Sequence, residues 1–476
     1  MFQIKRLVAE PLLRLSCVAS ASNSVALSRP VELPADSSRQ ALPLKRLLAH
    51  AQANVPFYHD RLQEPDSSVA TVSDLLNAVP VTTKDDIEAN FPDGVTDGSD
   101  PADWRMMSTR GTAQRLITIQ GFEKRDAVRA ANLRMLRLAG GYRPGMPMVE
   151  IPPEVCENVC GEMGEEDEGV LSHLWSMLRE RRLREQKSIR DLRGLVERNW
   201  IFNRKTYSGF GIHGSHPPPE ILDQYVAGLR RDRPYLLKAL ATYLTTIAKH
   251  LRDSDAKPLS IPVIKTMGSR VTPGQRELLE TSFGGKFWDD YGSAEFGSIA
   301  CECDQHHGLH VFDDFFIVEV VDANGGRVAD GELGWVLVTD LMNLTMPLIR
   351  YKIGDVGRID HSPCACGRTG PRLTVTGRAH DVIVDREGGW CTTDDVVDFL
   401  ESQPVVDSAQ VSVKSKGWYE IAAVAIRNAS IERGVLAASF AQWIGGQPRV
   451  DVNVVSTLRP EAGGKFRYVR GDLERR

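Results

Sequence analysis

The chain lacks the long apolar run that a transmembrane helix requires. No stretch of about 18 or more consecutive apolar residues occurs anywhere in the sequence. At the N-terminus, Glu10 and Arg14 interrupt the apolar core that a secretory signal peptide needs. Because the same stretch is rich in serine and poor in acidic residues, a transit peptide is an alternative. The sequence predicts a cytoplasmic protein that has no membrane partner.

An excess of positive charge is also missing. The 58 lysines and arginines are outnumbered by 63 aspartates and glutamates, so the formal net charge is -5. Nucleic-acid-binding chains usually concentrate positive charge, and nucleic acid is therefore not an expected partner. A length of 476 residues exceeds what one ordinary hydrophobic core accommodates, so we expect about two or three domains.

The chain has few cysteines, but four of the eight form two close pairs, Cys301/Cys303 and Cys364/Cys366. In a large intracellular chain, such pairs indicate a metal site more than a disulfide. Zinc prefers four such ligands in a closed tetrahedral shell, and a shell that joins two loops is structural. The sequence therefore predicts a structural zinc ion, with free buried cysteines as the alternative. The candidate ligands are Cys301, Cys303, His306, His307, His310, Cys364 and Cys366.

One short stretch has the composition of a binding site. The run from Asp289 to Gly297 reads Asp-Asp-Tyr-Gly-Ser-Ala-Glu-Phe-Gly and follows a short apolar segment. Glycines beside an aromatic ring and an acid are typical of a strand end where the backbone approaches a ligand closely. An ordinary glycine-containing turn is the alternative interpretation.

A second candidate is a loop rich in hydroxyl groups, Met106–Arg115, which the sequence places between two strands. Backbone amides and hydroxyls in such a loop can hold phosphate oxygens. The donors would come from Ser108, Thr109, Gly111 and Thr112. A hairpin with no ligand is the alternative.

Hydrophobic periodicity predicts the main helices and strands. We expect strands at 315–322 and 334–339. A polar turn would join them, and together they would form a small twisted sheet. Residues 171–200 predict an arginine-rich helix with one apolar stripe, either a solvated face or a lid or docking helix. Other helices are expected over 42–62, from 220, from Pro234 to Leu251, over 272–284 and over 394–400, and other strands over 261–265, 285–288 and 409–413.

Several segments, in order along the chain, resemble one enzyme family. Tyr291-Gly292-Ser293-Ala294-Glu295 resembles the adenine and magnesium motif of the adenylate-forming enzymes. Met346–Asp355 resembles their ribose motif, Gly377–Ile383 their hinge, and Glu461–Arg467 their catalytic lysine motif. Over roughly residues 42–470, the sequence is similar to the phenylacetate-coenzyme A ligase family, including its CapK-like branch.

The resemblance implies the multidomain α/β and α+β fold of the adenylate-forming enzymes. A large N-terminal domain of mixed sheets and helices would cover residues 1–376 and bind ATP and the acyl group. Within it, residues 150–211 would be a variable charged helical region. A hinge at 377–382 would lead to a small mobile α+β domain, 383–476, that carries the catalytic lysine.

The resemblance also implies a role for each matching residue. Lys465 would bridge carboxylate and phosphate oxygens, Glu295 would hold Mg²⁺, and Asp381 would be the pivot of the hinge. The residues matched to nucleotide binding are Ser108, Thr109, Gly111, Thr112, Gly268, Ser269, Asp290, Tyr291, Gly292, Ser293, Asp355 and Arg378. Several family members have a similar pattern of cysteines and a histidine. This resemblance favours zinc ligation by Cys303, His310, Cys364 and Cys366.

The implied reaction joins ATP and a carboxylic acid, often an aryl or arylacetic acid in the family, to give an acyl-adenylate. Coenzyme A is the first expected acceptor, and an amine or a carrier-protein thiol is the alternative. The phosphate loop departs from the family pattern, because Ala113 or Gln114 stands where a second glycine is usual. This departure supports a different class of function, a non-catalytic nucleotide-binding relative. A homodimer is a candidate assembly.

Overall fold

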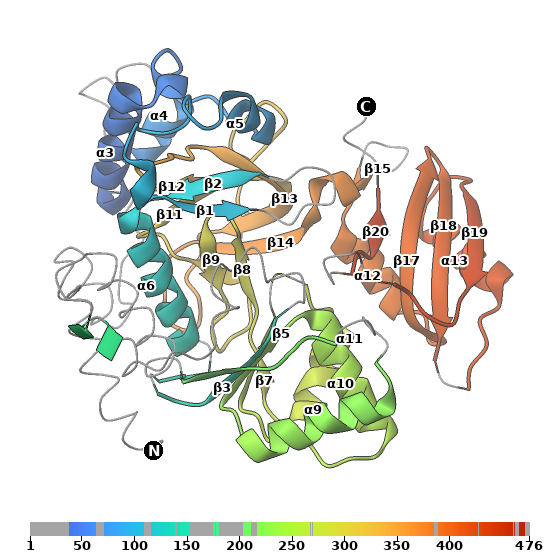
Figure 1. Ribbon diagram of the computed structural model, residues 1–476. Coiled ribbons are helices and arrows are strands. Elements are labelled where there is room, and N and C mark those ends of the chain that lie inside the picture. Colours follow the sequence, from blue (N-terminus) through green and yellow to red (C-terminus); the bar gives the residue numbers. More distant parts are fainter. Residues whose placement is uncertain are drawn as a thin grey trace.

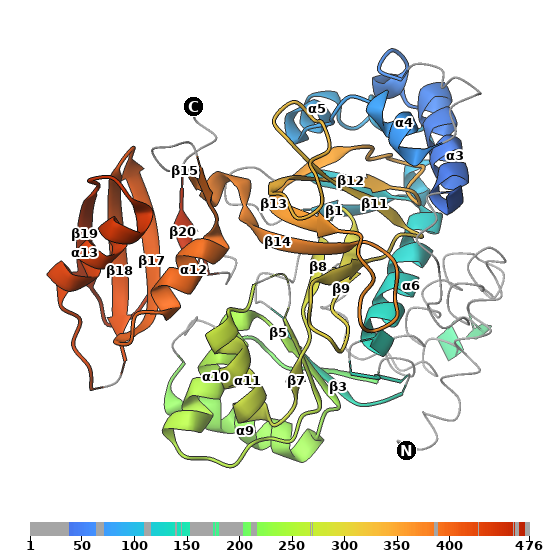
Figure 2. The same cartoon turned by 180° about the vertical axis from the view of Figure 1, so that it is seen from behind.

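The computed structural model of the chain describes residues 38–62, 71–108, 116–138, 140–143, 145–152, 175–176, 178–179, 203–210, 217–266, 268, 270–384, 389–426, 428–459, 461 and 466–471. Figures 1 and 2 show an upper part, a lower part and a C-terminal part that lies to one side of both. The charged helix expected over 171–200 falls almost wholly outside the described residues. Within the described residues, no helix is both long enough and apolar enough to cross a membrane.

The N-terminal helices pack on the upper part. Helix α3 (Ser38–Asn54) confirms most of the helix predicted over 42–62, and the short turn η1 (Pro56–Tyr58) replaces its end, since proline removes a helical hydrogen bond. The apolar side of α3 is buried together with α4 (Val72–Asn77) against the upper sheet. Helix α5 (Lys84–Asn90) starts at a capping box in which Thr83 and Asp86 satisfy each other's backbone amides.

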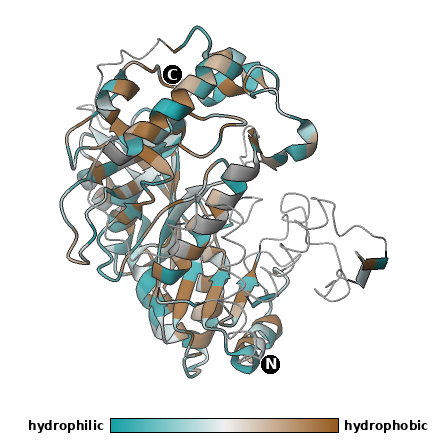
Figure 3. Ribbon diagram, turned by 90° about the vertical axis from the view of Figure 1, so that its left-hand side faces the viewer, coloured by the Kyte–Doolittle hydropathy of each residue, from teal (hydrophilic) through white to brown (hydrophobic). Residues whose placement is uncertain are grey.

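The lower part contains a five-stranded parallel sheet in the order β4-β3-β5-β6-β7. Three helices pack on one of its faces (Figure 1) and bury an apolar core between them and the strands. Figure 3 shows that the strands in this part are mostly hydrophobic, as expected of a buried parallel sheet. The elements are β3 (Met148–Ile151), β4 (Arg204–Thr206), α9 (Pro219–Asp232), β5 (Leu236–Ala239), α10 (Ala241–Asp253), β6 (Val263–Thr266), α11 (Pro273–Phe283) and β7 (Lys286–Phe287).

One predicted element in the lower part is wrong. The segment expected to be a single helix from Pro234 to Leu251 begins with strand β5, and helix α10 starts only at Ala241. Strand β5 is hydrogen-bonded to β3 on one side and β6 on the other. The periodicity of this short apolar run fits a helix or a strand, and the pairings make it a strand. The helices predicted from 220 and over 272–284 are confirmed by α9 and α11.

The upper part contains a seven-stranded antiparallel sheet in the order β11-β12-β13-β14-β10-β9-β8. The strands predicted at 315–322 and 334–339 are confirmed, but the small sheet expected from them is wrong. Strand β12 pairs on its second side with β13, and a free strand edge seldom stays unpaired. The strands are β8 (Asp290–Ser293), β9 (Gly297–Cys301), β10 (Leu309–Val311), β11 (Phe316–Val321), β12 (Gly334–Asp340), β13 (Tyr351–Asp360) and β14 (Arg372–Arg378).

A separate hairpin precedes the long helix α6 (Phe122–Leu138). Strand β1 (Arg105–Ser108) pairs with β2 (Ile117–Gln120), which confirms that the hydroxyl-rich loop connects two strands. The end of β2 is held to the upper part by Asn343, whose side-chain amide donates to the carbonyl of Ile119.

The C-terminal part has its own mixed sheet, in the order β19-β18-β17-β20, and its own apolar core drawn from residues 383–469. The helix predicted over 394–400 and the strand over 409–413 are confirmed. The elements are η6 (Ala379–Asp381), β15 (Ile383–Val384), β16 (Trp390–Cys391), α12 (Thr393–Glu401), β17 (Val406–Ser415), β18 (Trp418–Ala425), α13 (Arg433–Ile444), β19 (Arg449–Val454) and β20 (Val469–Arg470).

Polar contacts join the C-terminal part to the lower part. Lys249 of α10 lies 2.5 Å from Asp407 of β17, and the backbone amide of Gly274 donates to Glu401 at 3.1 Å. Arg270 forms an ion pair with Asp394.

Candidate functional site

Three predicted site residues meet at one end of the seven-stranded sheet. The hydroxyl of Tyr291 on β8 donates a 2.5 Å hydrogen bond to Oδ2 of Asp355 on β13. Arg378 lies opposite Asp355 in the pairing of β13 with β14, and its Nε is 3.2 Å from Oδ1 of Asp355. Gly354, just before Asp355, has a φ of 88°, a backbone conformation that favours glycine. The sheet thus brings a phenol, a carboxylate and a guanidinium together.

The Asp355 carboxylate favours the protonated forms of Tyr291 and Arg378. Burial and the neighbouring Asp355 carboxylate raise the pKa of Tyr291 well above its ordinary value, so the phenol stays neutral and donates. The same carboxylate raises the pKa of Arg378. Asp355 is itself buried and is held in one orientation by a donor at each oxygen. A buried carboxylate fixed in this way is suited to receive hydrogen bonds from a diol such as ribose.

Glu295 lies in the turn between β8 and β9 and is only 8% exposed. Its charge acts on Tyr291 and Arg378, which places it beside the same group. A hydrogen bond from Lys124 of α6 holds this turn in place, since its ammonium donates to the carbonyl of Phe296 at 2.9 Å. Lys124 is fully buried and pairs with Asp340 at 2.6 Å.

The strand that carries Tyr291 also rests on a buried lysine. Nζ of Lys265 is 3.0 Å from Oδ1 of Asp290 and 3.3 Å from the carbonyl oxygen of Trp288. Beside it, burial and the negative charges of Glu302 and Asp290 raise the pKa of Asp289 to about 7. Lys265 was not among the predicted site residues, although its place at the end of the apolar run from Ile261 was a usable signal.

Other predicted site residues are described incompletely or not at all. Gly268 follows β6 with a φ of 60°, and Ser108 ends β1 opposite Ile117. Gly292 and Ser293 belong to β8. The predicted residues that lie outside the described part of the chain are Thr109, Gly111, Thr112, Ser269 and Lys465.

Asp381 is buried in η6, directly after β14. It forms an ion pair with Arg467, and its Oδ1 also accepts from the backbone amide of Gly471 at 3.5 Å. Residue 381 therefore lies where the upper sheet ends and the last strand of the C-terminal part returns.

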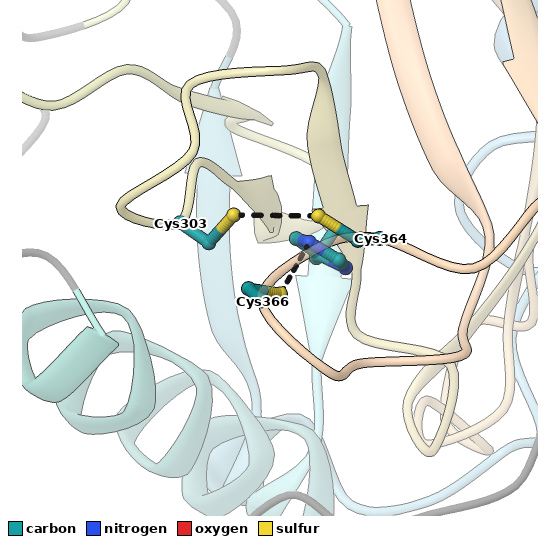
Figure 4. A group of neighbouring side chains, drawn as sticks. Cys303, Cys364 and Cys366 are labelled. Atoms are coloured by element: carbon teal, nitrogen blue, oxygen red, sulfur yellow. Dashed lines mark hydrogen bonds between the residues drawn. The ribbon is translucent and has the colours of Figure 1, made fainter.

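The predicted metal ligands form a compact group. The ligand atoms of Cys303, His310, Cys364 and Cys366 all lie within 4.8 Å of one another. The sulfurs of Cys303 and Cys364 are 3.8 Å apart, and the sulfur of Cys366 is 3.5 Å from Nε2 of His310 (Figure 4). A tetrahedral zinc ion, with bonds of about 2.3 Å to sulfur and about 2.0 Å to nitrogen, separates two sulfurs by about 3.8 Å and sulfur from nitrogen by about 3.5 Å. These residues therefore fit a zinc ion.

The other candidate ligands, Cys301, His306 and His307, do not belong to this group of described residues. Cys301 lies in β9, outside the group, and burial raises the pKa of its thiol to about 12. The ring of His306 packs against Trp288 and its Nδ1 is 2.9 Å from Glu302. His310, by contrast, has its pKa lowered to about 4 by burial and by nearby arginines, so its imidazole is neutral.

Proteins with similar sequences include several phenylacetate-coenzyme A ligases. The one from Thermus thermophilus is 25% identical over 393 residues, which cover 79% of this chain and 77% of the relative. The one from Escherichia coli is 25% identical over 374 residues, 75% of each chain. Protein CapK of Staphylococcus aureus is 24% identical over 199 residues, 40% of this chain and 42% of CapK. No family model matches the chain.

Two solved structures show the same fold. A 2-hydroxyisobutyryl-CoA ligase in the postadenylation state has a TM-score of 0.70 and 20% identity, and the match covers 93% of this chain and 91% of that one. An amide bond synthetase from Marinactinospora thermotolerans has a TM-score of 0.52 and 17% identity, over 77% of this chain and 68% of that one. The chain is therefore a relative of the phenylacetate-coenzyme A ligases and has the fold of the adenylate-forming enzymes, as its motifs predicted.

Proposed function

We propose that the chain is an AMP-forming ligase that activates a carboxylic acid as an acyl-adenylate and transfers the acyl group to coenzyme A. The observation that carries the proposal is the group of Tyr291, Asp355 and Arg378, which offers a ring face, a fixed carboxylate and a cation to one nucleotide. The sequence relatives support the same activity, and they favour an aryl or arylacetic acid.

The first step would be attack of the substrate carboxylate on the α-phosphorus of ATP, with pyrophosphate as the leaving group. Both reactants are anionic, so the protein contributes mainly by holding them in line and offsetting charge. Asp355 would accept hydrogen bonds from the ribose hydroxyls, and Tyr291, with Asp290, Gly292, Ser293 and Gly268 around it, would pack against adenine. Bound Mg²⁺, held by Glu295, would offset the phosphate charge.

Ser108 and several residues outside the described part of the chain complete the proposal. Lys465 would bridge the carboxylate and the α-phosphate, and the hydroxyls of Ser108, Thr109 and Thr112, with Gly111 and Ser269, would hold phosphate and base. These roles come from the resemblance of their motifs to the family.

We propose the boundaries 1–376 for the large domain, 377–382 for the hinge and 383–476 for the small domain. The separate apolar core of residues 383–469 supports this division. Rotation at Asp381 would move Lys465 away after adenylation and bring the acceptor in, as domain closure at a few residues allows.

We also propose a structural zinc ion on Cys303, His310, Cys364 and Cys366. Its support is the agreement of the two measured separations with a tetrahedral shell, and the closed set of four ligands leaves no position for a substrate. The cytoplasmic location and the homodimer stay predictions of the sequence.

The test is carboxylate-dependent release of pyrophosphate by the full-length protein with ATP and Mg²⁺. A panel of aryl, arylacetic and aliphatic acids is assayed with and without coenzyme A, and ATP binding is measured in parallel by calorimetry. Release that one acid stimulates and coenzyme A accelerates is the expected result. Release that an amine or a carrier protein accelerates instead would change the acceptor, and the fold shared with an amide bond synthetase makes an amine a reasonable second choice.

The opposite result has a clear meaning. A protein that binds ATP but releases no pyrophosphate with any acid would be a non-catalytic nucleotide-binding relative. A protein that does not bind ATP would overturn the whole proposal.

A further inference from the structure

Glu302 lies one residue before Cys303 of the metal group and is only 7% exposed. Both of its carboxylate oxygens have polar partners. Oε1 accepts a 2.7 Å hydrogen bond from Arg276 of α11. Oε2 accepts from the backbone amide of Asp289 at 2.9 Å and lies 2.9 Å from Nδ1 of His306. A buried carboxylate with this set of partners fixes the positions of all the segments that it joins.

A second hydrogen bond joins the segment of Glu302 to the segment of Asp289. The backbone amide of Glu302 donates to the carbonyl oxygen of Asp289 at 3.0 Å. Asp289 directly precedes β8, the strand of Tyr291, and Asp290 is paired with Cys301 across β8 and β9. A displacement of Glu302 would therefore be passed to the start of the strand that presents Tyr291.

The metal group joins the β8–β9 hairpin to the β13–β14 hairpin. Cys364 and Cys366 lie in the connection between β13 and β14, the two strands that hold Asp355 and Arg378. Cys303 follows β9, in the hairpin that holds Tyr291. The two hairpins are thus joined twice, by the bond from Tyr291 to Asp355 at one end and by the metal group at the other.

We propose that metal bound to this group positions the nucleotide-binding side chains, and that Glu302 is the positioning residue that connects the metal group to β8. The proposal rests on the nucleotide site and the zinc ion proposed above. It also has a reciprocal consequence, because a metal that favours nucleotide binding must itself be held more tightly when nucleotide is bound. A metal that only stabilises the fold would have the same affinity with and without nucleotide.

The test measures the extent of zinc release at equilibrium from the zinc-loaded full-length protein into a chromogenic chelator, with and without saturating ATP and Mg²⁺. We expect ATP to lower the Kd for zinc by about fivefold or more in the wild type. In Glu302→Gln, the amide group would face the amide of Asp289 or lose the bond from Arg276. We expect this variant to keep its zinc but to lose most of the effect of ATP.

Glu280→Gln is the matched control. Glu280 accepts from the backbone amide of Phe287 at 3.1 Å, so it makes the same type of bond two residues before Asp289, but it lies on α11 and not in the segment that carries Cys303. This variant should keep the full effect of ATP on zinc release.

Calorimetric binding of ATP to the same samples separates the possible failures. Zinc release that is unaffected by ATP in a wild-type protein that binds both would overturn this inference and leave the proposed ligase intact. An unchanged effect of ATP in Glu302→Gln would remove Glu302 as the connection. A wild-type protein isolated without metal would overturn the inference at its first step.

Discussion

Tyr291 and Asp355 are 64 residues apart in the sequence, yet their side chains form a hydrogen bond of 2.5 Å. The bond joins β8, the edge strand of the seven-stranded sheet, to β13, the fifth strand counted from that edge. The bond joins the strand proposed to carry adenine to the strand proposed to carry ribose. It therefore sets the distance between the two halves of the nucleotide site.

Replacing Tyr291 with phenylalanine tests this bond. The ring is kept, but one donor to a buried carboxylate is lost, and such bonds contribute about 1.5–3 kcal/mol. We expect the Kd for ATP, measured by calorimetry, to rise roughly tenfold or more. Tyr142→Phe removes a hydroxyl that donates to the carbonyl oxygen of Met146 at 3.1 Å and not to Asp355, and should leave the Kd unchanged. Equal affinities in all three proteins would contradict the role of Tyr291.

Replacing Lys465 with alanine should abolish adenylation while ATP binding persists. The expected reason is the loss of the one cation that would offset charge on both the carboxylate and the α-phosphate during attack. Pyrophosphate release and calorimetric ATP binding are measured on the same preparation. Lys414→Ala, at an exposed ion pair with Glu420 in the C-terminal part, is the control. An undiminished rate in Lys465→Ala would exclude this lysine from the mechanism.

Replacing Cys364 and Cys366 together with serine should remove the zinc ion and lower the Tm, because metal binding contributes directly to the folded state. Metal content by plasma emission spectrometry and thermal unfolding provide the two measurements. Cys391→Ser changes a cysteine of β16 outside the metal group and should keep about one zinc per chain. The zinc assignment fails if the wild-type protein is fully folded and contains no metal.

Asp289 predicts a specific dependence of stability on pH. Its pKa is about 7 in the folded chain, well above the value of about 3.9 for an unfolded aspartate. Between these values the folded state binds more protons, so this group makes the free energy of unfolding fall as pH rises from about 4 to about 7. Asp289→Asn resembles the protonated form and should flatten that fall.

Urea unfolding of the wild type and of Asp289→Asn over this pH range checks the expectation. Asp253→Asn, at an exposed pair with Arg252, should follow the wild type. Parallel curves for the wild type and Asp289→Asn would show that the Asp289 carboxyl titrates as it does in the unfolded chain.

Local patterns predicted the elements whose signals are local. The helix predicted over 272–284 and the strand predicted over 315–322 correspond to α11 and β11, because a capping box at Thr272 and Gln275 and a run rich in Phe, Ile and Val are local signals. The segment 236–239 was misassigned because only its pairing with β3 and β6 distinguishes it from helix. The motif residues Tyr291, Asp355 and Arg378 were found because each lies in a characteristic run of sequence.

The residues that support the site could not be found in the same way. Lys124, Lys265 and Glu302 are charged side chains whose partners lie far along the chain or in another layer, as with the carbonyl of Phe296 that accepts from Lys124. From sequence, Lys124 and Glu302 are indistinguishable from solvated surface charges, and Lys265 is marked only by its place at the end of the apolar run from Ile261. Burial and pairing, which the sequence does not record, give them their roles.

The contacts between the C-terminal part and the lower part have a consequence for the energy of rearrangement. The pair of Lys249 and Asp407 is partly exposed, and an exposed ion pair of this type contributes about 0–1 kcal/mol. The apolar core of residues 383–469 does not depend on these contacts. This ion pair therefore adds little to the free energy needed to separate the two surfaces, and added salt, which screens exposed charges, lowers its contribution further.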